Sequence, residues 1–149
     1  MKTVHLITVG KLKDKNLEQI ENNFYKRIKS LKLLIHELKS SSENKEAEGQ
    51  LILKKLNDLS SSFVCGLTER GKSFDSPSFS RFLYQELEKN SSLCFVIAGA
   101  EGFSAEVIKK FNIELSLSAM TFPHKLARLL FIEQFYRAIT IHENHPYHN

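Results

Sequence analysis

Short apolar runs alternate with amphipathic stretches along this chain of 149 residues. The apolar runs, which are typical of strands, lie at residues 4–9, 31–38, 63–67, 93–98 and 113–117. Stretches with apolar residues three and four positions apart predict helices, and they lie at residues 16–30, 45–59, 76–90, 104–111 and 123–140. This alternation favours a three-layer α/β fold, in which helices flank a mostly parallel sheet.

Two details of the pattern sharpen this prediction. The run 93–98 contains no charged residue, which is typical of a strand buried on both faces of a parallel sheet. Ser76 precedes Pro77, and Thr121 stands shortly before Pro123. Because Ser and Thr are favoured N-caps and proline is favoured in the first helical turn, we expect Ser76 and Thr121 to cap their helices. The polar stretches 39–44 and 60–62 are expected to connect elements.

Length and composition indicate one globular domain. We find no internal repeat, linker or low-complexity segment, and no apolar run approaches the ~20 residues of a bilayer span. Met1-Lys2 leads directly into a strand-like run without the features of a secretory signal, so we expect a cytoplasmic protein with no membrane partner. Cys65 and Cys94 lie inside apolar runs and are expected to be buried core residues.

The formal net charge of +4 and the pI near 9.0 are compatible with a polyanionic partner. The excess is modest, and charge alone does not identify RNA. The function therefore has to be inferred from particular residues rather than from the net charge.

Three loops follow predicted strands directly, at residues 67–72, 99–102 and 118–123. In an open parallel sheet, ligands bind beyond the carboxyl ends of the strands, so these loops outline a ligand site. The turn 99–102 matches neither a dinucleotide fingerprint nor a P-loop. Gly99 and Gly102 instead permit positive φ and a close approach of the backbone to a ligand, although a purely structural turn is an equal alternative.

The last helix and the tail concentrate polar chemistry. Glu133 and Arg137 are four residues apart. They form either an ordinary exposed ion pair on the helix or a pair with a functional role. His142, His145 and His148 are three residues apart, but Pro146 interrupts the register and the H-E-x-x-H spacing is missed. We therefore expect no metal. Imidazole and phenol groups in this tail suit proton handling or stacking on a base.

These residues also carry a family resemblance. The segments that carry it are 95–102 (FVIAGAEG), 115–124 (LSLSAMTFPH), Arg128, 133–134 (EQ), 136–138 (YRA) and 145–148 (HPYH). The chain resembles the bacterial ribosomal RNA large subunit methyltransferase H family over its full length, including 9–11 (VGK) and the 71–72 (GK) loop.

The resemblance implies a fold and an activity. The fold would be an α/β-knot of the SPOUT class, in which the C-terminal segment forms a trefoil knot. Such a knot is an exception to the rule that the connections between secondary-structure elements are not knotted. The activity would be methylation of N3 of a pseudouridine in 23S rRNA of the assembled ribosome. The enzyme would use S-adenosylmethionine, would act as a homodimer and would need no metal.

The resemblance also implies site residues. The cofactor contacts would be Leu67, Gly99, Ser118, Ala119, Met120, Thr121, Phe122 and Pro123. Methyl transfer has to align donor and acceptor and to remove the imide proton from N3. Our first candidates for the proton step are His148 and Tyr147, and the supporting groups are Arg128, His124 and Arg137.

Two positions depart from the family pattern. Ala98-Gly99 stands where family members often carry paired glycines, which is tolerable if Gly99 alone approaches the cofactor. Asn149 stands where a Lys or Arg commonly follows the final His, and this leaves the chemistry of the tail open. Two alternative functions remain: a related knotted methyltransferase that acts on tRNA, and a ribosome-binding factor without catalysis.

Overall fold

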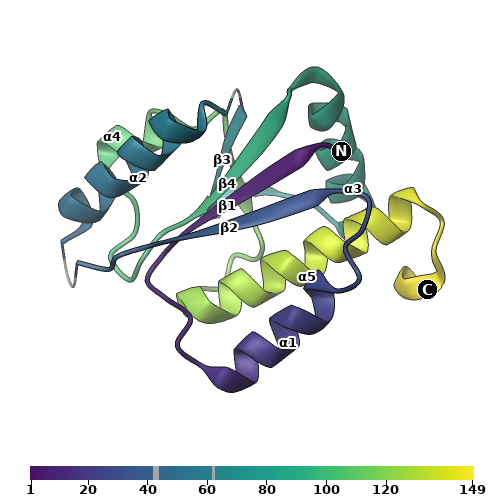
Figure 1. Cartoon of the computed structure of the whole chain (residues 1–149). Helices are drawn as coiled ribbons and strands as arrows, with labels where there is room; N and C mark the ends of the chain where they lie inside the picture. Colours follow the sequence, from purple (N-terminus) through teal and green to yellow (C-terminus); the bar gives the residue numbers. More distant parts are fainter. Residues whose placement is uncertain (42–43, 62) are drawn as a thin grey trace.

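The computed structural model describes residues 1–41, 44–61 and 63–149, so Ser62 and part of the predicted connection 39–44 lie outside the described residues. Strands and helices alternate along the whole chain (Figure 1). The strands are β1 (Thr3–Val9), β2 (Lys32–Leu38), β3 (Phe63–Ser73), β4 (Ser92–Ile97) and β5 (Ile113–Ser116). The helices are α1 (Lys15–Tyr25), α2 (Lys45–Leu59), α3 (Ser76–Lys89), α4 (Ala105–Ile108) and α5 (His124–His142), followed by the 3-10 turn η1 (Pro146–His148).

The five strands form one sheet in the order β2-β1-β4-β3-β5, and every paired neighbour is parallel. The apolar run 93–98 forms β4, which lies in the middle of the sheet between β1 and β3. Leu93 to Ile97 are all buried, as the absence of charge predicts. Because all strands are parallel, their carboxyl ends meet at one edge, which is where the predicted ligand loops begin.

Helices cover both faces of the sheet (Figure 1). The larger core cluster lies under α1, α3 and α5 and is centred on Phe95, Phe131 and Phe135, which are at most 1% exposed. The second cluster lies under α2 and α4 and contains Ile52 and Val107. The predicted three-layer α/β architecture is therefore confirmed. Within the described residues, no helix is both long and apolar enough to cross a bilayer.

The helix boundaries correct several predictions. The first helix ends at Tyr25 instead of residue 30, and α4 is shorter than the predicted 104–111. Asp75, not Ser76, caps α3, because its carboxylate accepts the N–H of Ser78 at 2.8 Å. The prediction that Thr121 caps the last helix is also wrong, because the N-cap of α5 is Pro123 and has no side-chain cap bond.

Strand β3 is longer than predicted, because it continues past Leu67 to Ser73. Leu67 and Lys72 both pair with Leu115 of β5, and the residues between them form a bulge against that strand. Gly71 packs on the β5 backbone so closely that a Cβ there would lie 2.6 Å from the carbonyl of Glu114. A glycine is therefore required where the two segments cross. The trefoil knot itself stays a prediction.

Both cysteines are buried as predicted, with Cys65 at 1% and Cys94 at 0% exposure. Burial raises the pKa of the Cys94 thiol to about 12. Neither sulfur is therefore a thiolate at neutral pH, and both act as small apolar side chains.

Candidate functional site

A cavity of about 850 Å³ opens at the carboxyl edge of the sheet. Its size falls within the range of ~300–1,000 Å³ typical of ligand sites. Its walls come from the three predicted loops and the first turns of α5, and they consist of residues 67–70, 97–103, 117–118, 120–124, Lys45, Ile108 and Ala127. The structure therefore brings the three loops together at one site.

The loop after β4 contains both predicted glycines, but each is needed for a different reason. Gly102 has a φ of +80°, as predicted for a residue that favours the left-handed region. Gly99 has no positive φ. A Cβ on Gly99 would lie 2.7 Å from Oε1 of Glu48 and 3.2 Å from Cγ1 of Val9. Gly99 thus packs closely against the buried Glu48 of α2, and the expectation of positive φ there is wrong.

Hydroxyl groups hold the loop after β5 in place. The Oγ of Ser116 lies 3.1 Å from the carbonyl oxygen of Glu69 and 2.9 Å from that of Ser118. The Oγ of Ser118 accepts the N–H of Met120 at 3.0 Å. Ser116 therefore ties the β3 and β5 loops together, while the Met120 side chain, 73% exposed, lies at the rim.

One hydroxyl on the cavity wall has no hydrogen-bond partner among the described residues. The Oγ1 of Thr68 is buried and forms no hydrogen bond with any described residue. Buried polar atoms are nearly always paired, so a ligand in the cavity is the natural partner. The neighbouring wall is mainly apolar, with Leu67, Ile97 and Leu117.

His124 is the first residue of α5 and lines the cavity. Its Nε2 would lie 3.6 Å from a Cβ on Gly10, a residue with a φ of +92° at the end of β1. The imidazole therefore lies against a glycine of the β1–α1 loop, where the positive φ would strain any larger residue.

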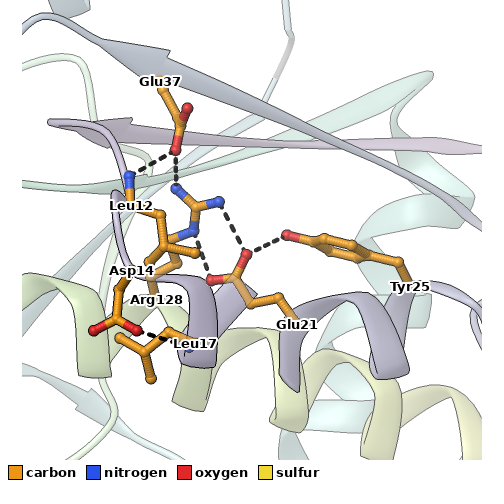
Figure 2. A network of polar contacts seen from close by, with 7 residues as sticks. All are labelled: Leu12, Asp14, Leu17, Glu21, Tyr25, Glu37 and Arg128. Atoms are coloured by element: carbon orange, nitrogen blue, oxygen red, sulfur yellow. Dashed lines mark hydrogen bonds and ion pairs between the residues drawn. The ribbon is translucent and has the colours of Figure 1, made fainter. Parts of the chain in front are cut away.

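Arg128 does not line the cavity, although it lies one turn after His124. The residue is 8% exposed, and its guanidinium forms ion pairs with Glu21 of α1 and Glu37 of β2 (Figure 2). Nε and Nη2 donate to Glu21 at 2.8 and 2.9 Å, and Nη1 donates to Glu37 at 2.6 Å. Burial alone would lower the pKa of Arg128, but the hydrogen bonds to both carboxylates raise it overall.

Further hydrogen bonds extend this network to the loop beside the cavity. The same oxygen of Glu37 accepts the N–H of Leu12 at 3.0 Å, and the Tyr25 hydroxyl donates to Glu21 at 2.7 Å (Figure 2). Burial and the bond to Glu21 raise the pKa of Tyr25. The network therefore fixes the start of α5 relative to α1, β2 and the β1–α1 loop, and Arg128 is held away from any ligand.

A second polar cluster lies at the other end of α5. Glu133 accepts hydrogen bonds from Arg137 at 2.8 and 3.1 Å and from the Tyr147 hydroxyl at 3.0 Å, all on Oε2. The Arg137 guanidinium carbon lies 4.8 Å from the Tyr147 ring centroid, and Nη1 lies 3.0 Å from Nδ1 of His148. Glu133 and Arg137 are thus more than an isolated exposed pair, because they hold the tail.

These contacts determine which tail atoms carry protons. Arginine only donates, so Nδ1 of His148 accepts and a neutral ring carries its proton on Nε2. Burial and the hydrogen bond to Glu133 raise the pKa of Tyr147, which keeps the phenol protonated. In this arrangement His148 presents a donor at Nε2 and the Tyr147 hydroxyl donates to Glu133, whereas a proton acceptor was expected from the sequence.

The two ends of α5 lie far apart within one chain. His124 and Arg137 are separated by thirteen helical positions, which is about 20 Å along the axis. Figure 1 shows the start of α5 near the carboxyl ends of the strands and the C-terminal tail at the opposite end of the helix. The five residues expected to share the chemistry therefore divide into His124 at the cavity, Arg128 inside the protein, and Arg137, Tyr147 and His148 at the tail.

Most of the predicted cofactor residues lie at the cavity. Leu67, Gly99, Ser118 and all of 120–123 line the cavity, and Ala119 is the one member that does not. Thr68 to Arg70 also line the cavity, as expected for the predicted ligand loop 67–72, although this segment continues strand β3. Sequence reasoning missed Ala127, although its place one turn after Pro123 and His124 signals it. No group of three or more His, Cys, Asp or Glu residues that could hold a metal occurs in the described part of the chain.

The fold has a counterpart among solved structures. A probable methylase family protein from Haemophilus influenzae Rd KW20 matches with a TM-score of 0.58 and 12% identity, over 95% of this chain and 68% of that chain. Likeness at this level of identity concerns the fold alone. The family model described as "Predicted SPOUT methyltransferase" matches residues 1–148. The chain therefore belongs to the SPOUT methyltransferase family, and the predicted fold class is confirmed apart from the knot.

Sequence relatives narrow the family further. Ribosomal RNA large subunit methyltransferase H of Acholeplasma laidlawii (strain PG-8A) is 40% identical over 146 residues, covering 97% of this chain and 98% of the relative. The protein of the same name from Clostridium acetobutylicum is 41% identical over 158 residues, with the same coverage of both chains. These relatives confirm the resemblance predicted from the sequence.

Proposed function

We propose that this protein transfers a methyl group from S-adenosylmethionine to N3 of a pseudouridine in 23S rRNA of the assembled ribosome. The cavity at the carboxyl edge of the sheet is the observation that carries this proposal, because the predicted cofactor loops meet there. Membership of a methyltransferase family and the names of the relatives support the reaction and the rRNA substrate. We place the reaction in the cytoplasm, where ribosomes are.

The cavity suits S-adenosylmethionine in both size and chemistry. Its apolar wall offers a surface for a flat base, and the unpaired Thr68 hydroxyl offers a hydrogen bond to a polar edge. The start of α5 also faces the cavity through Pro123 and His124, and the positive end of a helix favours a carboxylate. When bound, the cofactor supplies an electrophilic methyl group on a sulfonium.

We assign the proton step to His124. Removal of the weakly acidic N3 proton needs an acceptor within hydrogen-bond reach of the nucleotide, and His124 is the histidine among the described lining residues. The tail residue His148 donates a hydrogen bond from Nε2 instead, and its role is to bind RNA oxygens and to stabilise the charge that develops on the carbonyl groups beside N3. Tyr147 donates its hydroxyl proton to Glu133 and so holds the tail in place.

We further propose that two chains share each site. Leu126 and Leu130, on the cavity half of α5, are 44% and 39% exposed, which is typical of a helix that pairs with a second copy. A two-fold axis close to these residues would pair the α5 helices in opposite directions. The tail of one chain would then reach the cavity of the other, which joins groups that lie about 20 Å apart within one chain.

The test is methyl transfer from labelled S-adenosylmethionine to ribosomes, free 23S rRNA and tRNA, followed by mapping of the modified nucleotide. We expect label at one pseudouridine of 23S rRNA when intact ribosomes are the substrate. Label found only in tRNA would assign the protein to the tRNA-modifying enzymes. Binding to ribosomes without any transfer, and without a shift in melting temperature on adding the cofactor, would make it a non-catalytic factor.

A further inference from the structure

A second cavity, of about 420 Å³, lies between the end of α1 and the C-terminal half of α5. Three cations line it, Lys26, Arg27 and Lys29, all from the turn that joins α1 to β2. Glu143 is the one carboxylate among its described lining residues. This cavity shares no lining residue with the cofactor cavity, and its excess of positive charge plays no part in the site described above.

The turn fixes how these cations are presented. Ile28 packs against the main core cluster, and its N–H lies 3.2 Å from the carbonyl oxygens of both Phe24 and Tyr25. Its neighbours Arg27 and Lys29 are exposed. Because Ile28 anchors the turn from the inside, the flanking cations are held at the surface, and less backbone entropy is lost when they bind a partner.

The three cations are not neutralised within the protein. None of them forms an ion pair with any residue that the structure describes. The Arg27 guanidinium carbon instead lies 5.9 Å from the ring centroid of Tyr136, and the Tyr147 ring packs edge-on against Tyr136 at 4.8 Å. An aromatic face positions the guanidinium while its charge stays available to an external anion.

A histidine adds a further donor to the same cavity. Nδ1 of His145 accepts the N–H of Tyr147 at 3.2 Å, so Nε2 is the ring nitrogen that can donate to a ligand. The cavity thus combines three cations and an imidazole donor. Lysine and arginine side chains are among the groups that proteins use to contact nucleic-acid phosphates.

We infer that this second cavity binds backbone phosphates of the substrate RNA. The inference rests on the proposed function, since it supplies a contact by which an rRNA methyltransferase holds its substrate. RNA fits better than an acidic protein because the cations adjoin the aromatic rings of Tyr136 and Tyr147, and basic and aromatic groups together characterise RNA-binding surfaces.

The first experiment removes the charge. A variant with Lys26→Gln, Arg27→Gln and Lys29→Gln is compared with a control that carries Lys54→Gln, Lys109→Gln and Lys110→Gln on the α2 and α4 face, where all three lysines are exposed. Both lose the same charge. Single Lys26→Gln is a further variant that leaves the Arg27–Tyr136 packing intact.

The readouts are the KM for ribosomes and its dependence on salt. Each phosphate contact contributes about 0.7 to the log–log salt slope for single-stranded nucleic acid, so we expect the slope of the triple variant to be shallower by about 2. Its KM at physiological salt should rise about tenfold, with the loss in KM rather than in kcat. The control should stay within about twofold of the wild type. Equal KM values and slopes in the triple variant and the control would overturn the inference.

A second experiment identifies what binds at the second cavity and tests phosphate binding separately from methyl transfer. A photoreactive benzoylphenylalanine at position 29 is cross-linked to ribosomes, and a cross-link to rRNA is expected. Cross-links to ribosomal proteins alone would overturn the inference. If the wild type transfers no methyl group, the proposed function fails, but the salt slope of ribosome co-sedimentation without cofactor still supports or overturns phosphate binding at this cavity.

Discussion

Helix α5 carries two arginines that lie in opposite environments. Arg128 is 8% exposed and is held by carboxylates from α1 and β2. Arg137, about two and a half turns later, has a side chain that is 25% exposed and pairs with Glu133 of its own helix. Arg128 joins parts of the fold, whereas Arg137 joins the helix to the tail.

The difference shows how one helix serves two purposes. A buried charge has to be paired, so Arg128 and its carboxylates fix the position of α5 and lose the freedom to meet a ligand. A partly exposed pair contributes little to stability, but its atoms remain accessible to RNA. Position in the fold, and not residue type, thus decides which of the two arginines is accessible to a ligand.

The largest effect is expected from Arg128→Met. This change leaves Glu21, which is 1% exposed, without its cation, and breaking a buried pair from one side costs about 3–5 kcal/mol. The free energy of unfolding should therefore fall by that amount in urea denaturation. The matched variant Arg137→Met should lose less than about 1 kcal/mol. Similar losses in the two variants would remove the distinction between the two ends of α5.

The next effect concerns the cavity end. If His124 accepts the N3 proton, His124→Ala should lower kcat about 10²-fold or more, since general base catalysis contributes ~10²–10⁴-fold. Cofactor affinity, measured by calorimetry, should stay within severalfold of the wild type. A variant that keeps its kcat and loses only cofactor affinity would make His124 a binding residue and would return the proton step to the tail.

A smaller effect is expected at the tail end. Tyr147→Phe removes the hydroxyl that donates to Glu133, and one lost hydrogen bond to a charged group corresponds to about 1.5–3 kcal/mol at most. We expect the KM for ribosomes to rise about tenfold because the tail is held less firmly, while the free energy of unfolding falls by no more than about 1.5–3 kcal/mol. An unchanged KM together with a lowered kcat would contradict a role for Tyr147 in holding an RNA-binding tail.

The smallest effect is the acid dependence of the Arg128 network. Burial alone would raise the pKa of Glu37, but the hydrogen bonds from Arg128 and Leu12 lower it below the ordinary value of 4.5. As the pH falls, the Glu37 carboxylate therefore takes up a proton in the unfolded chain before it does so in the folded protein. The stabilisation that this carboxylate contributes is fully present above about pH 4.5 and is lost as the pH falls through the lowered pKa. In Glu37→Gln, chemical denaturation between pH 5 and 3 should show a weaker acid dependence, and an equal dependence would contradict this role.

Much of the fold follows from local patterns in the sequence. Each predicted strand and helix exists, and the charge-free run 93–98 lies in the middle of the sheet. The strand order and the extension of β3 to Ser73 do not follow, because they depend on contacts with β5, distant in the sequence. The cap of α3 was predicted one residue late, because Asp75 and Ser76 are both favourable N-caps.

The sequence predicted only those parts of the site that depend on residues close together in the chain. The loops that follow strands gave most of the cavity, because parallel strands end at one edge of the sheet. The role of Arg128 depends on Glu21 and Glu37, which are 107 and 91 residues away. Nothing in the spacing around Arg128 indicates those partners. Glu133 and Arg137 could be paired from their spacing, but their contacts with the tail depend on how the chain turns after α5.

The central claim is that the cavity end and the tail end of α5 complete each other across two chains. Mixed dimers test it most directly, with Thr121→Trp to block the cavity in one chain and Arg137→Met to disable the tail in the other. Each variant alone should transfer little methyl label to ribosomes. If each cavity uses its partner's tail, random mixing should restore about a quarter of the wild-type rate, because half of the dimers are mixed and each contains one complete site. A mixture no more active than the two variants alone would contradict the shared site.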